Sequence, residues 1–312
     1  MYGAILGDII GSSYEFRPCK RKDFLLFTEA SRYTDDTVMT LAVARAFLDL
    51  LAEGRDADQA GARLGGGGEL EGGPSLGLAS QEGPTCRPKL PSPDRVQEAL
   101  TRRMREYGLR HLDAGYGGGF SRWLQDPEAG PYHSFGNGSA MRVSSVAWLF
   151  DDIDLVSQAA RLSAAVTHNH PEGVKGAEAV ASCIFLARQG VSKAGIKHYV
   201  TEAFDYDLDR TLAEIRPGYS FDVTCQGSVP EAILAFLEGR DFEDCIRNAI
   251  SLGGDADTQA AIAGSIAEAY YGLPEVLVKH IQTYLPEDLL EVAADFQTQK
   301  LPNDHFNHLS IK

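Results

Sequence analysis

The sequence predicts an all-α fold. Apolar residues recur at helical spacing through much of the 312-residue chain, as in the run Val96, Leu100, Met104 and Tyr107, which is typical of helices that bury one face. Sustained alternation of apolar and polar residues, the pattern of a half-buried strand, is scarce. Hydrophobic residues make up 44% of the chain, enough for a sizeable core. We therefore expect one all-α domain over residues 1–312.

Composition narrows the class of protein. The formal net charge of −15 and the sequence pI of about 4.9 argue against a groove that follows nucleic-acid phosphates, although a local basic patch remains compatible with them. The five cysteines are odd in number, widely separated and without a CxxC pair, so we expect reduced thiols in a cytoplasmic protein and no zinc site. No signal-peptide n-region precedes Asp8, and no apolar run is long enough to span a membrane.

The first element is expected over residues 2–14, a short helix whose small residues suit close packing against another helix. Asp8 on this helix is either a group behind an active site or a partner for the end of a neighbouring helix, and we favour the second role. Glu15 follows where the chain leaves the helix, and a loop continues to Tyr33. A longer helix with one broad apolar face is expected over residues 35–51.

The sequence changes character between about residues 54 and 93. This stretch contains a tetraglycine at 65–68, five prolines, few large apolar residues and no hydrophobic period. That composition predicts a flexible or disordered insertion. A tetraglycine can belong to a phosphate-binding loop, but the GxxxxGK[ST] pattern is absent, so a linker is the better interpretation.

Two glycine-rich stretches follow the insertion. A turn within GYGGGFSRWL (115–124) leads into a helix anchored by aromatic residues, and the loop at 134–139 precedes a segment that returns to the core. Gly136 and Gly138 allow the backbone to approach a ligand closely, and such a loop before a helix can accept an anion.

The second half of the chain is again helical. His168 and His170 precede an amphipathic helix within residues 167–190, and we expect them to form hydrogen bonds with a ligand or with the backbone. Two further helices are separated by Gly239, with Asp241 as the cap of the second. One last helix is expected within residues 286–312.

Two turns combine carboxylates with hydroxyls immediately before an apolar helix. GGDADTQAAIAGSIAEAYYG at 253–272 places Asp255, Asp257 and Thr258 on the first turn of such a helix. YTDDTVMTLAVARAFLDLL at 33–51 does the same with Thr34, Asp35, Asp36 and Thr37. The unpaired backbone N–H groups and the dipole at a helix start favour anionic groups there.

For Asp255 alone, helix capping and metal binding are equally good interpretations. A cap needs one oxygen, whereas this turn supplies several, as Mg²⁺ or Mn²⁺ requires. Two such turns, far apart in the sequence, can meet in the fold and share two cations, because like charges would otherwise repel one another strongly. The pair of turns therefore predicts a two-metal site.

These segments together resemble the ADP-ribosylglycohydrolase family, the group that contains dinitrogenase-reductase-activating glycohydrolase and the vertebrate ADP-ribosyl-acceptor hydrolases. Six motifs carry the resemblance in the order of the family and cover nearly the whole chain outside the insertion. They are GAILGDIIGSSYEF (3–16), YTDDT (33–37), GYGGG (115–119), FGNGSAMR (135–142), THNHP (167–171) and GGDADTQAAIAG (253–264).

The resemblance implies a compact, single-domain orthogonal helical bundle with a binuclear Mg²⁺ or Mn²⁺ centre in a cleft. By motif match, the metal ligands would be Thr34, Asp35, Asp36, Asp255, Asp257 and Thr258. Glu15 would lie on a mobile loop over the site and help to position or activate water. The substrate-binding residues would be Gly117, Gly118, Gly119, Ser134, Phe135, Gly136, Asn137, Gly138, Ser139 and His168, with Phe135 stacking on adenine and His168 near the phosphates.

The implied activity is hydrolysis of the glycosidic bond between ADP-ribose and an acceptor. Glu15 is the first choice for proton transfer, with Asp36 and Asp255 behind it. The acceptor would be a protein side chain, arginine being favoured, and serine-linked, nucleic-acid-linked and small ADP-ribosyl compounds are alternatives. A non-catalytic ADP-ribose binder and a purely structural helical protein fit less well, because every matched carboxylate is present. We expect a monomer.

Overall fold

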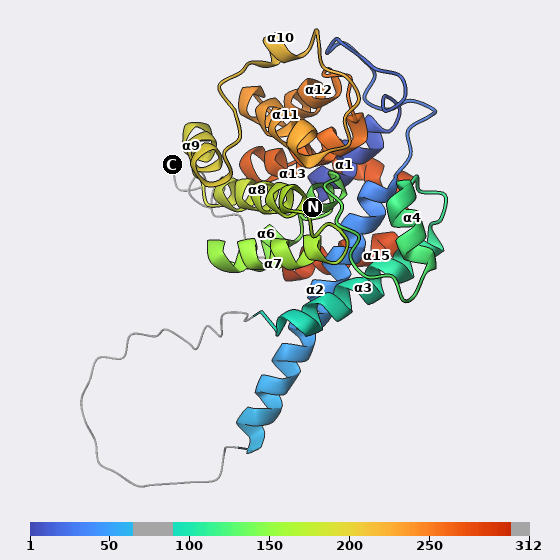
Figure 1. Cartoon of the computed structure of the whole chain (residues 1–312), viewed down its shortest axis with the longest axis vertical. Helices are drawn as coiled ribbons and strands as arrows, with labels where there is room; N and C mark the ends of the chain where they lie inside the picture. The colour runs from blue at the N-terminus through green and yellow to red at the C-terminus, as the bar shows by residue number, and fades with distance from the viewer. Residues whose placement is uncertain (65–89, 301–312) are drawn as a thin grey trace, which may run out of the picture.

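The computed structural model describes residues 1–64 and 90–300, and for residues 56–64 the backbone only. Within these residues every regular element is an α-helix, and one isolated β-bridge joins Gly136 to Thr224 (Figure 1). The predicted all-α class is confirmed. The helices are α1 (Tyr2–Gly11), α2 (Asp35–Leu64), α3 (Pro93–Arg110), α4 (Gly118–Gln125), α5 (Gly138–Met141), α6 (Val146–Leu149), α7 (Ile153–Ala165), α8 (Pro171–Arg188), α9 (Lys193–Phe204), α10 (Leu212–Ile215), α11 (Cys225–Glu238), α12 (Phe242–Ile250), α13 (Ala256–Tyr271), α14 (Glu275–Tyr284) and α15 (Glu287–Gln299).

The helix pair α1 and α13 lies at the centre of the fold, and the two backbones touch. A Cβ atom added to any of three glycines on α1 would come within 2.1 to 2.5 Å of a carbonyl oxygen on α13. The pairs are Gly3 with Gly264, Gly7 with Ala260 and Gly11 with Ala256. Since no side chain fits in that space, the small residues that the sequence predicted for close packing are required here.

The other helices pack around this pair. Helices α8, α11 and α12 contact α13, and α8 also packs on α7. Helix α2 contacts α3 and α15 on one side and α1 and α13 on the other. The starts of α2 and α13, which carry the two acidic turns, are therefore placed against the same short helix, α1.

Helix α2 is longer than the sequence predicted. It continues to Leu64, so residues 54–64, which were assigned to a flexible insertion, are helical and extend away from the other helices (Figure 1). This stretch has no apolar face, but its Ala, Arg and Gln residues favour a helix by themselves. Helix α3 then begins at Pro93. The remainder of the predicted insertion, residues 65–89, lies outside the described residues.

Two of the predicted local features are confirmed, and four helices, α7, α9, α10 and α14, have no counterpart among the predicted elements. The Asp241 carboxylate caps α12 by accepting from the Asp244 N–H at 2.8 Å, and His170 Nδ1 accepts from the Glu172 N–H at 3.1 Å at the start of α8. For α14, the sequence signal is misleading: Gly272 with Pro274 is a typical stop for the helix at 253–272 and indicates no new helix after it. Pro274 instead occupies the N-cap position of α14, where the missing N–H of proline costs nothing.

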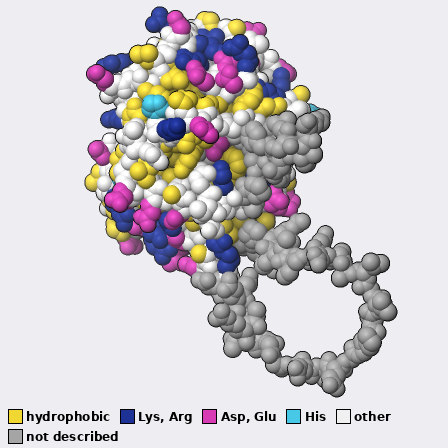
Figure 2. Space-filling view, turned by 180° about the vertical axis from the view of Figure 1, so that it is seen from behind, with side chains coloured by type: hydrophobic (Ala, Val, Ile, Leu, Met, Phe, Trp, Pro, Cys, Tyr) yellow, Lys and Arg dark blue, Asp and Glu magenta, His cyan; other side chains and the backbone are white. Residues whose placement is uncertain are grey.

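Surface and thiol properties agree with the composition. Among the described cysteines, Cys19, Cys183, Cys225 and Cys245 are free thiols. None of the described helices combines the length and the apolarity that a membrane span requires. On the face shown in Figure 2, acidic and basic side chains are intermixed with apolar ones, so the net negative charge does not form a single patch there.

Candidate active site

Asp8 of α1 fixes the first acidic turn, residues 34–37, by hydrogen bonds. The fully buried Asp8 carboxylate accepts from the backbone N–H groups of Thr34 at 2.9 Å and Thr37 at 3.1 Å, and from both threonine hydroxyls. Asp8 thus satisfies two of the N–H groups at the start of α2, those of Thr34 and Thr37, in agreement with the favoured interpretation. With the capping done from another helix, Asp35 and Asp36 are left for other partners.

The second acidic turn is not capped by its own aspartate. Asp255 occupies the N-cap position of α13 but makes no side-chain cap hydrogen bond. Its Oδ2 instead accepts from Asn137 Nδ2 at 2.7 Å, while Asp257 Oδ1 accepts from the Thr258 N–H at 3.0 Å. The capping interpretation of Asp255 is therefore wrong. Its carboxylate faces the loop at residues 134–139, which we call the glycine-rich loop.

The two turns meet, although they lie more than 200 residues apart in the chain. Thr258 Oγ1 of the second turn donates to Asp36 Oδ2 of the first at 3.1 Å. Carboxylate oxygens of Glu15, Asp255 and Asp257 lie within 4.8 Å of one another. We call Glu15, Asp35, Asp36, Asp255 and Asp257 the carboxylate cluster.

The electrostatics of the carboxylate cluster suit divalent cations. Burial, with the charges of neighbouring carboxylates, raises the pKa of Asp35, Asp36 and Asp257 well above the ordinary value. Burial and the Asp257 charge raise the pKa of Glu15 to about 8. Without cations the cluster must hold protons, and bound cations would replace them.

One atom points to a missing partner. Asp36 Oδ1 is buried and has no hydrogen-bond partner among the described residues, and leaving such an acceptor unpaired costs about 1–3 kcal/mol or more. The donor set consists of carboxylate and hydroxyl oxygens, which Mg²⁺ and Mn²⁺ prefer. The residues present therefore fit a hard divalent metal.

A cavity of about 350 Å³ opens beside the carboxylate cluster. All five cluster residues line it, together with most of the residues predicted to bind substrate. Those are Gly117, Gly118, Gly119, Ser134, Gly136, Asn137, Gly138 and His168, and Thr258 lines it as well. The glycine-rich loop is fixed on its outer side, because the Asn137 N–H donates to the Val223 carbonyl at 2.8 Å.

His168 faces the glycine-rich loop as a neutral imidazole. Burial, with the charge of Arg142, lowers its pKa well below 6.5. Arg142 Nη2 donates to Thr167 Oγ1 at 3.0 Å, and this hydroxyl lies 2.7 Å from His168 Nδ1. The arrangement that uses every hydrogen has Thr167 donate to Nδ1, which leaves the hydrogen on Nε2. A Cβ atom on Gly138 would lie 3.2 Å from this Nε2, and both residues line the cavity.

Three predicted residues do not line the cavity. The Thr34 hydroxyl donates to Asp8 at 2.7 Å, and the buried Ser139 hydroxyl donates to the Gly173 carbonyl at 2.7 Å. The Phe135 ring is 45% exposed and lies against His170, with centroids 5.4 Å apart. Thr34 and Ser139 hold the backbone in place, and Phe135 is outside the cavity wall in this conformation.

Several lining residues were missed by the sequence analysis. They are Met39, Gly115, Phe120, Tyr132, Met141, Arg142, Phe221 and Val223. Arg142 ends the FGNGSAMR motif, which could have singled it out. Phe221 and Val223 lie in a segment without a motif, which is held at the cavity by the bridge between Gly136 and Thr224 and by the stacking of Phe221 on Phe16.

The comparisons with known proteins agree with this geometry. The family model described as ADP-ribosylglycohydrolase matches residues 1–304. The chain is similar to ADP-ribosylhydrolase ARH3 of Mus musculus, with 27% identity over 88% of this chain and 83% of the relative, and to that of Homo sapiens, with 27% identity over 88% and 85%. Among solved structures, an "ADP-ribosylglycohydrolase-related protein complex" matches with a TM-score of 0.60, 23% identity and 96% coverage of both chains, which supports the fold.

Proposed function

Because the chain belongs to the ADP-ribosylglycohydrolase family, we propose that it is a divalent-cation-dependent hydrolase that releases ADP-ribose from a modified protein side chain. The observation that carries the proposal is the junction of the two acidic turns, where Thr258 contacts Asp36 and Glu15 joins Asp255 and Asp257. The glycine-rich loop at 134–139 and His168 lie on the wall of the same cavity.

Two groups of residues on the cavity wall differ in chemistry, and this difference supports one orientation for the substrate. The His168 Nε2–H and the remaining backbone N–H groups of the 134–139 loop would provide donors for a diphosphate. The N–H groups of Gly136 and Asn137 are not available, because they donate to Ser134 Oγ and to the Val223 carbonyl. Asp35, Asp36, Asp255, Asp257 and Thr258 would hold the two cations. Thr34, whose hydroxyl hydrogen is donated to Asp8, could add only a lone pair of its oxygen. When bound, Mg²⁺ or Mn²⁺ supplies Lewis-acid stabilisation of charge on the ribose that is being cleaved.

Among the carboxylates, Glu15 is best placed to transfer a proton. Asp255 is held by Asn137 and Asp36 by Thr258, so both carboxylates already have fixed partners. Glu15 lies on the turn after α1 and is only partly buried. It can therefore approach the leaving group or water, whereas Asp36 and Asp255 are second choices.

The acceptor that the sequence favours is arginine. One feature favours a neutral acceptor such as serine as a second candidate. Among the described residues that line the cavity, the acidic ones all belong to the carboxylate cluster, so a guanidinium acceptor would find no separate carboxylate to pair with. A hydroxyl-linked acceptor needs no such partner.

The test measures release of ADP-ribose from arginine-linked and serine-linked peptides and from an ADP-ribosylated oligonucleotide, with and without Mg²⁺ or Mn²⁺. Asp257→Asn should abolish release. Glu243→Gln, which alters a partly exposed carboxylate on α12 that pairs with Arg247, is the matched control and should leave release unchanged. Cation-dependent release from one substrate identifies the acceptor. Binding of free ADP-ribose without any release would instead indicate a non-catalytic binder.

We further propose that the protein acts in the cytoplasm as a monomer. The free thiols of Cys183, Cys225 and Cys245 are buried, as expected for a reducing compartment. Light scattering coupled to size-exclusion chromatography would test the oligomeric state, and a stable dimer would contradict it.

A further inference from the structure

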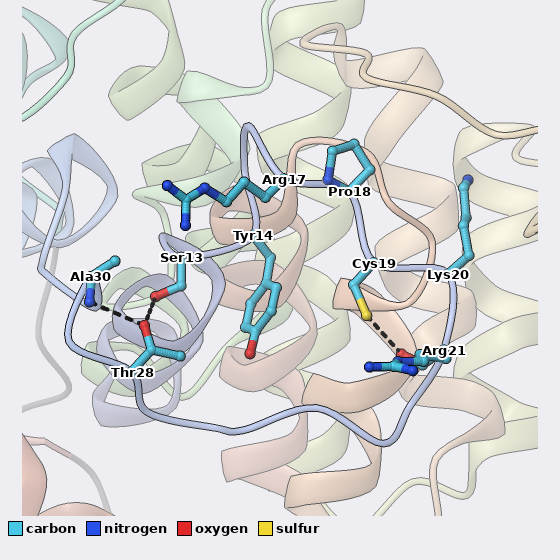
Figure 3. Close-up of a pocket in the computed structure, with 9 residues that line it drawn as sticks. All are labelled: Ser13, Tyr14, Arg17, Pro18, Cys19, Lys20, Arg21, Thr28 and Ala30. Carbon is cyan, nitrogen blue, oxygen red and sulfur yellow. Dashed lines mark hydrogen bonds between the residues drawn. The ribbon is translucent and has the colours of Figure 1, made fainter.

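Lys20 lies on the loop that carries Glu15, and its ammonium group ends among three backbone carbonyls. Nζ donates to the carbonyl oxygens of Arg216 at 2.9 Å, Tyr219 at 2.5 Å and Leu252 at 2.5 Å. Figure 3 shows the loop, with the Lys20 side chain extending away from Cys19 and Arg21. The Lys20 side chain therefore joins the Glu15 loop to the 216–219 segment and to Leu252, in the segment that immediately precedes α13.

The contact with Leu252 is next to the second acidic turn. Leu252 is followed by Gly253 and Gly254, and then by Asp255. Gly253 has a φ of +66°, which disfavours other residues, and a Cβ atom there would lie 3.0 Å from Lys20 Cε. A Cβ atom on Gly254 would come within 2.4 Å of the Tyr219 ring. The Gly-Gly turn is thus enclosed by the Lys20 stem on one side and by the Tyr219 ring on the other.

We propose that Lys20 is a positioning residue that fixes Glu15 and the metal-ligating turn in one arrangement. By anchoring its loop, Lys20 holds Glu15 in position. Through its contact with Leu252, Lys20 also holds the Gly-Gly turn that positions Asp255 and Asp257. These three carboxylates are the ones that lie within 4.8 Å of one another. The inference rests on the proposed function for its catalytic consequence, but its structural part does not.

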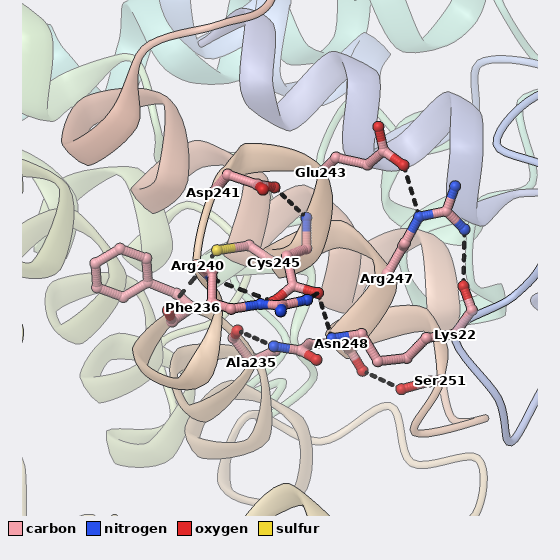
Figure 4. A network of polar contacts seen from close by, with 12 residues as sticks. Lys22, Ala235, Phe236, Arg240, Asp241, Glu243, Cys245, Arg247, Asn248 and Ser251 are labelled. Atoms are coloured by element: carbon pink, nitrogen blue, oxygen red, sulfur yellow. Dashed lines mark hydrogen bonds and ion pairs between the residues drawn. The ribbon is translucent and has the colours of Figure 1, made fainter.

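The same loop has a second anchor that serves as a control. Lys22 forms an ion pair with Asp244 on α12, and Arg247 Nη1 donates to the Lys22 carbonyl at 2.7 Å (Figure 4). Among the interactions of the described residues, none links the Lys22 side chain to Leu252 or to the 216–219 segment. Loss of Lys22 loosens the loop without releasing the Gly-Gly turn, whereas loss of Lys20 releases both.

The experiment compares Lys20→Met, Lys22→Met and Lys20→Arg with the wild-type protein. Each variant is first checked by thermal unfolding, so that loss of fold is recognised. Cation affinity is measured as the Mg²⁺ or Mn²⁺ concentration that gives half of the thermal stabilisation. Kinetics are measured with the acceptor peptide that the wild type cleaves, at saturating cation. Hydrogen exchange of the amides at 253–257 reports the turn itself.

For Lys20→Met we expect about a tenfold higher half-saturating cation concentration, about a tenfold lower kcat and a KM changed by less than about threefold. The KM should hold because Lys20 does not touch the glycine-rich loop that binds the diphosphate. Amides 253–257 should exchange faster. Lys22→Met should show none of these changes, and Lys20→Arg, which retains a cationic donor, should recover part of the loss.

Two results would overturn the inference. The first is a Lys20→Met protein whose cation affinity and exchange at 253–257 match the wild type. The second is a Lys22→Met protein that shows the same losses, since loop anchoring in general would then be the cause. If the wild type neither binds cations nor releases ADP-ribose, the proposed function fails, and the exchange comparison still decides whether Lys20 holds the turn.

Discussion

Stripping divalent cations from this protein should make its stability fall as the pH rises from 5 to 8. Burial, with the charges of Glu15 and Asp35, raises the pKa of Asp255 from 3.8 to about 6. The folded state therefore keeps a proton that the unfolded state has already released. Stability that depends on this proton is complete below pH 3.8 and is lost as the pH rises through 6.

The magnitude follows from the Asp255 values. Between pH 5 and pH 7 the folded carboxyl releases about one proton more than the unfolded one, which costs about 1.4 kcal/mol, or a tenfold change in the ratio of folded to unfolded protein. Asp255 is only 6% exposed, so solvent screening reduces this little. Glu15, whose pKa is raised to about 8, extends the loss toward pH 8 by a smaller amount because it is partly exposed. We expect Tm to fall by roughly 3–5 °C.

The assay is scanning calorimetry of cation-free and Mg²⁺-saturated protein at pH 5, 6, 7 and 8. The double variant Glu15→Gln with Asp255→Asn is measured in parallel. Subtracting its stability from that of the wild type at each pH removes the contribution of the other titrating groups in the chain. Saturating Mg²⁺ should flatten the fall or reverse it. The reasoning is refuted if cation-free wild type gains stability with pH relative to the double variant, or if both have the same profile.

Three further predictions concern single residues. Asp257→Asn should lower the rate of hydrolysis by at least about 100-fold, because transition-state stabilisation is lost. Without cations, the same variant should unfold at the same or a higher temperature than wild type, because a buried carboxyl group that is repelled by its neighbours is gone. A clear destabilisation of the variant would contradict this reasoning. Gly254→Ala should lower the free energy of unfolding, measured in urea, by about 1–3 kcal/mol, because the added Cβ would lie 2.4 Å from the Tyr219 ring. Gly130→Ala is the control and should leave this free energy nearly unchanged, because Gly130 has open space around it. Asp8→Ala should lower the free energy of unfolding, measured in urea, by about 3 kcal/mol or more, because four donors lose their acceptor. A decrease under about 1 kcal/mol would show that water replaces the carboxylate.

The sequence could predict the parts of the site whose chemistry is local. A carboxylate pair next to a hydroxyl at the start of an apolar helix is visible in a short window, so Asp36 and Thr258 were both identified before their contact was known. The role of Asp8 was also predictable, because an aspartate on a small-residue helix has few buried uses other than a helix end. The helix boundaries were less certain. Leu64 shows that a helix can continue on intrinsic propensity after its apolar face has ended.

The remaining parts depend on contacts between distant segments. Whether Asp255 caps α13 is decided by Asn137, which lies 118 residues earlier and donates to it. Phe221 and Val223 reach the cavity through contacts with distant segments, the bridge at Thr224 and the ring of Phe16. Lys20 is one of nine lysines in the sequence, and its three acceptors come from segments that no local pattern connects.

The backbone contact between α1 and α13 gives this chain an unusual sensitivity far from any ligand. Most helix pairs are separated by side chains that can change rotamer when one of them is altered. Between Gly7 and Ala260 there is no such layer, so an added methyl group must move one helix as a whole. Since α1 carries Asp8 and α13 begins with the second acidic turn, that movement changes the spacing of the two turns. In a saturation mutagenesis screen scored by hydrolysis, Gly3, Gly7 and Gly11 should therefore tolerate as few substitutions as the carboxylates, although none of the three contacts the cavity.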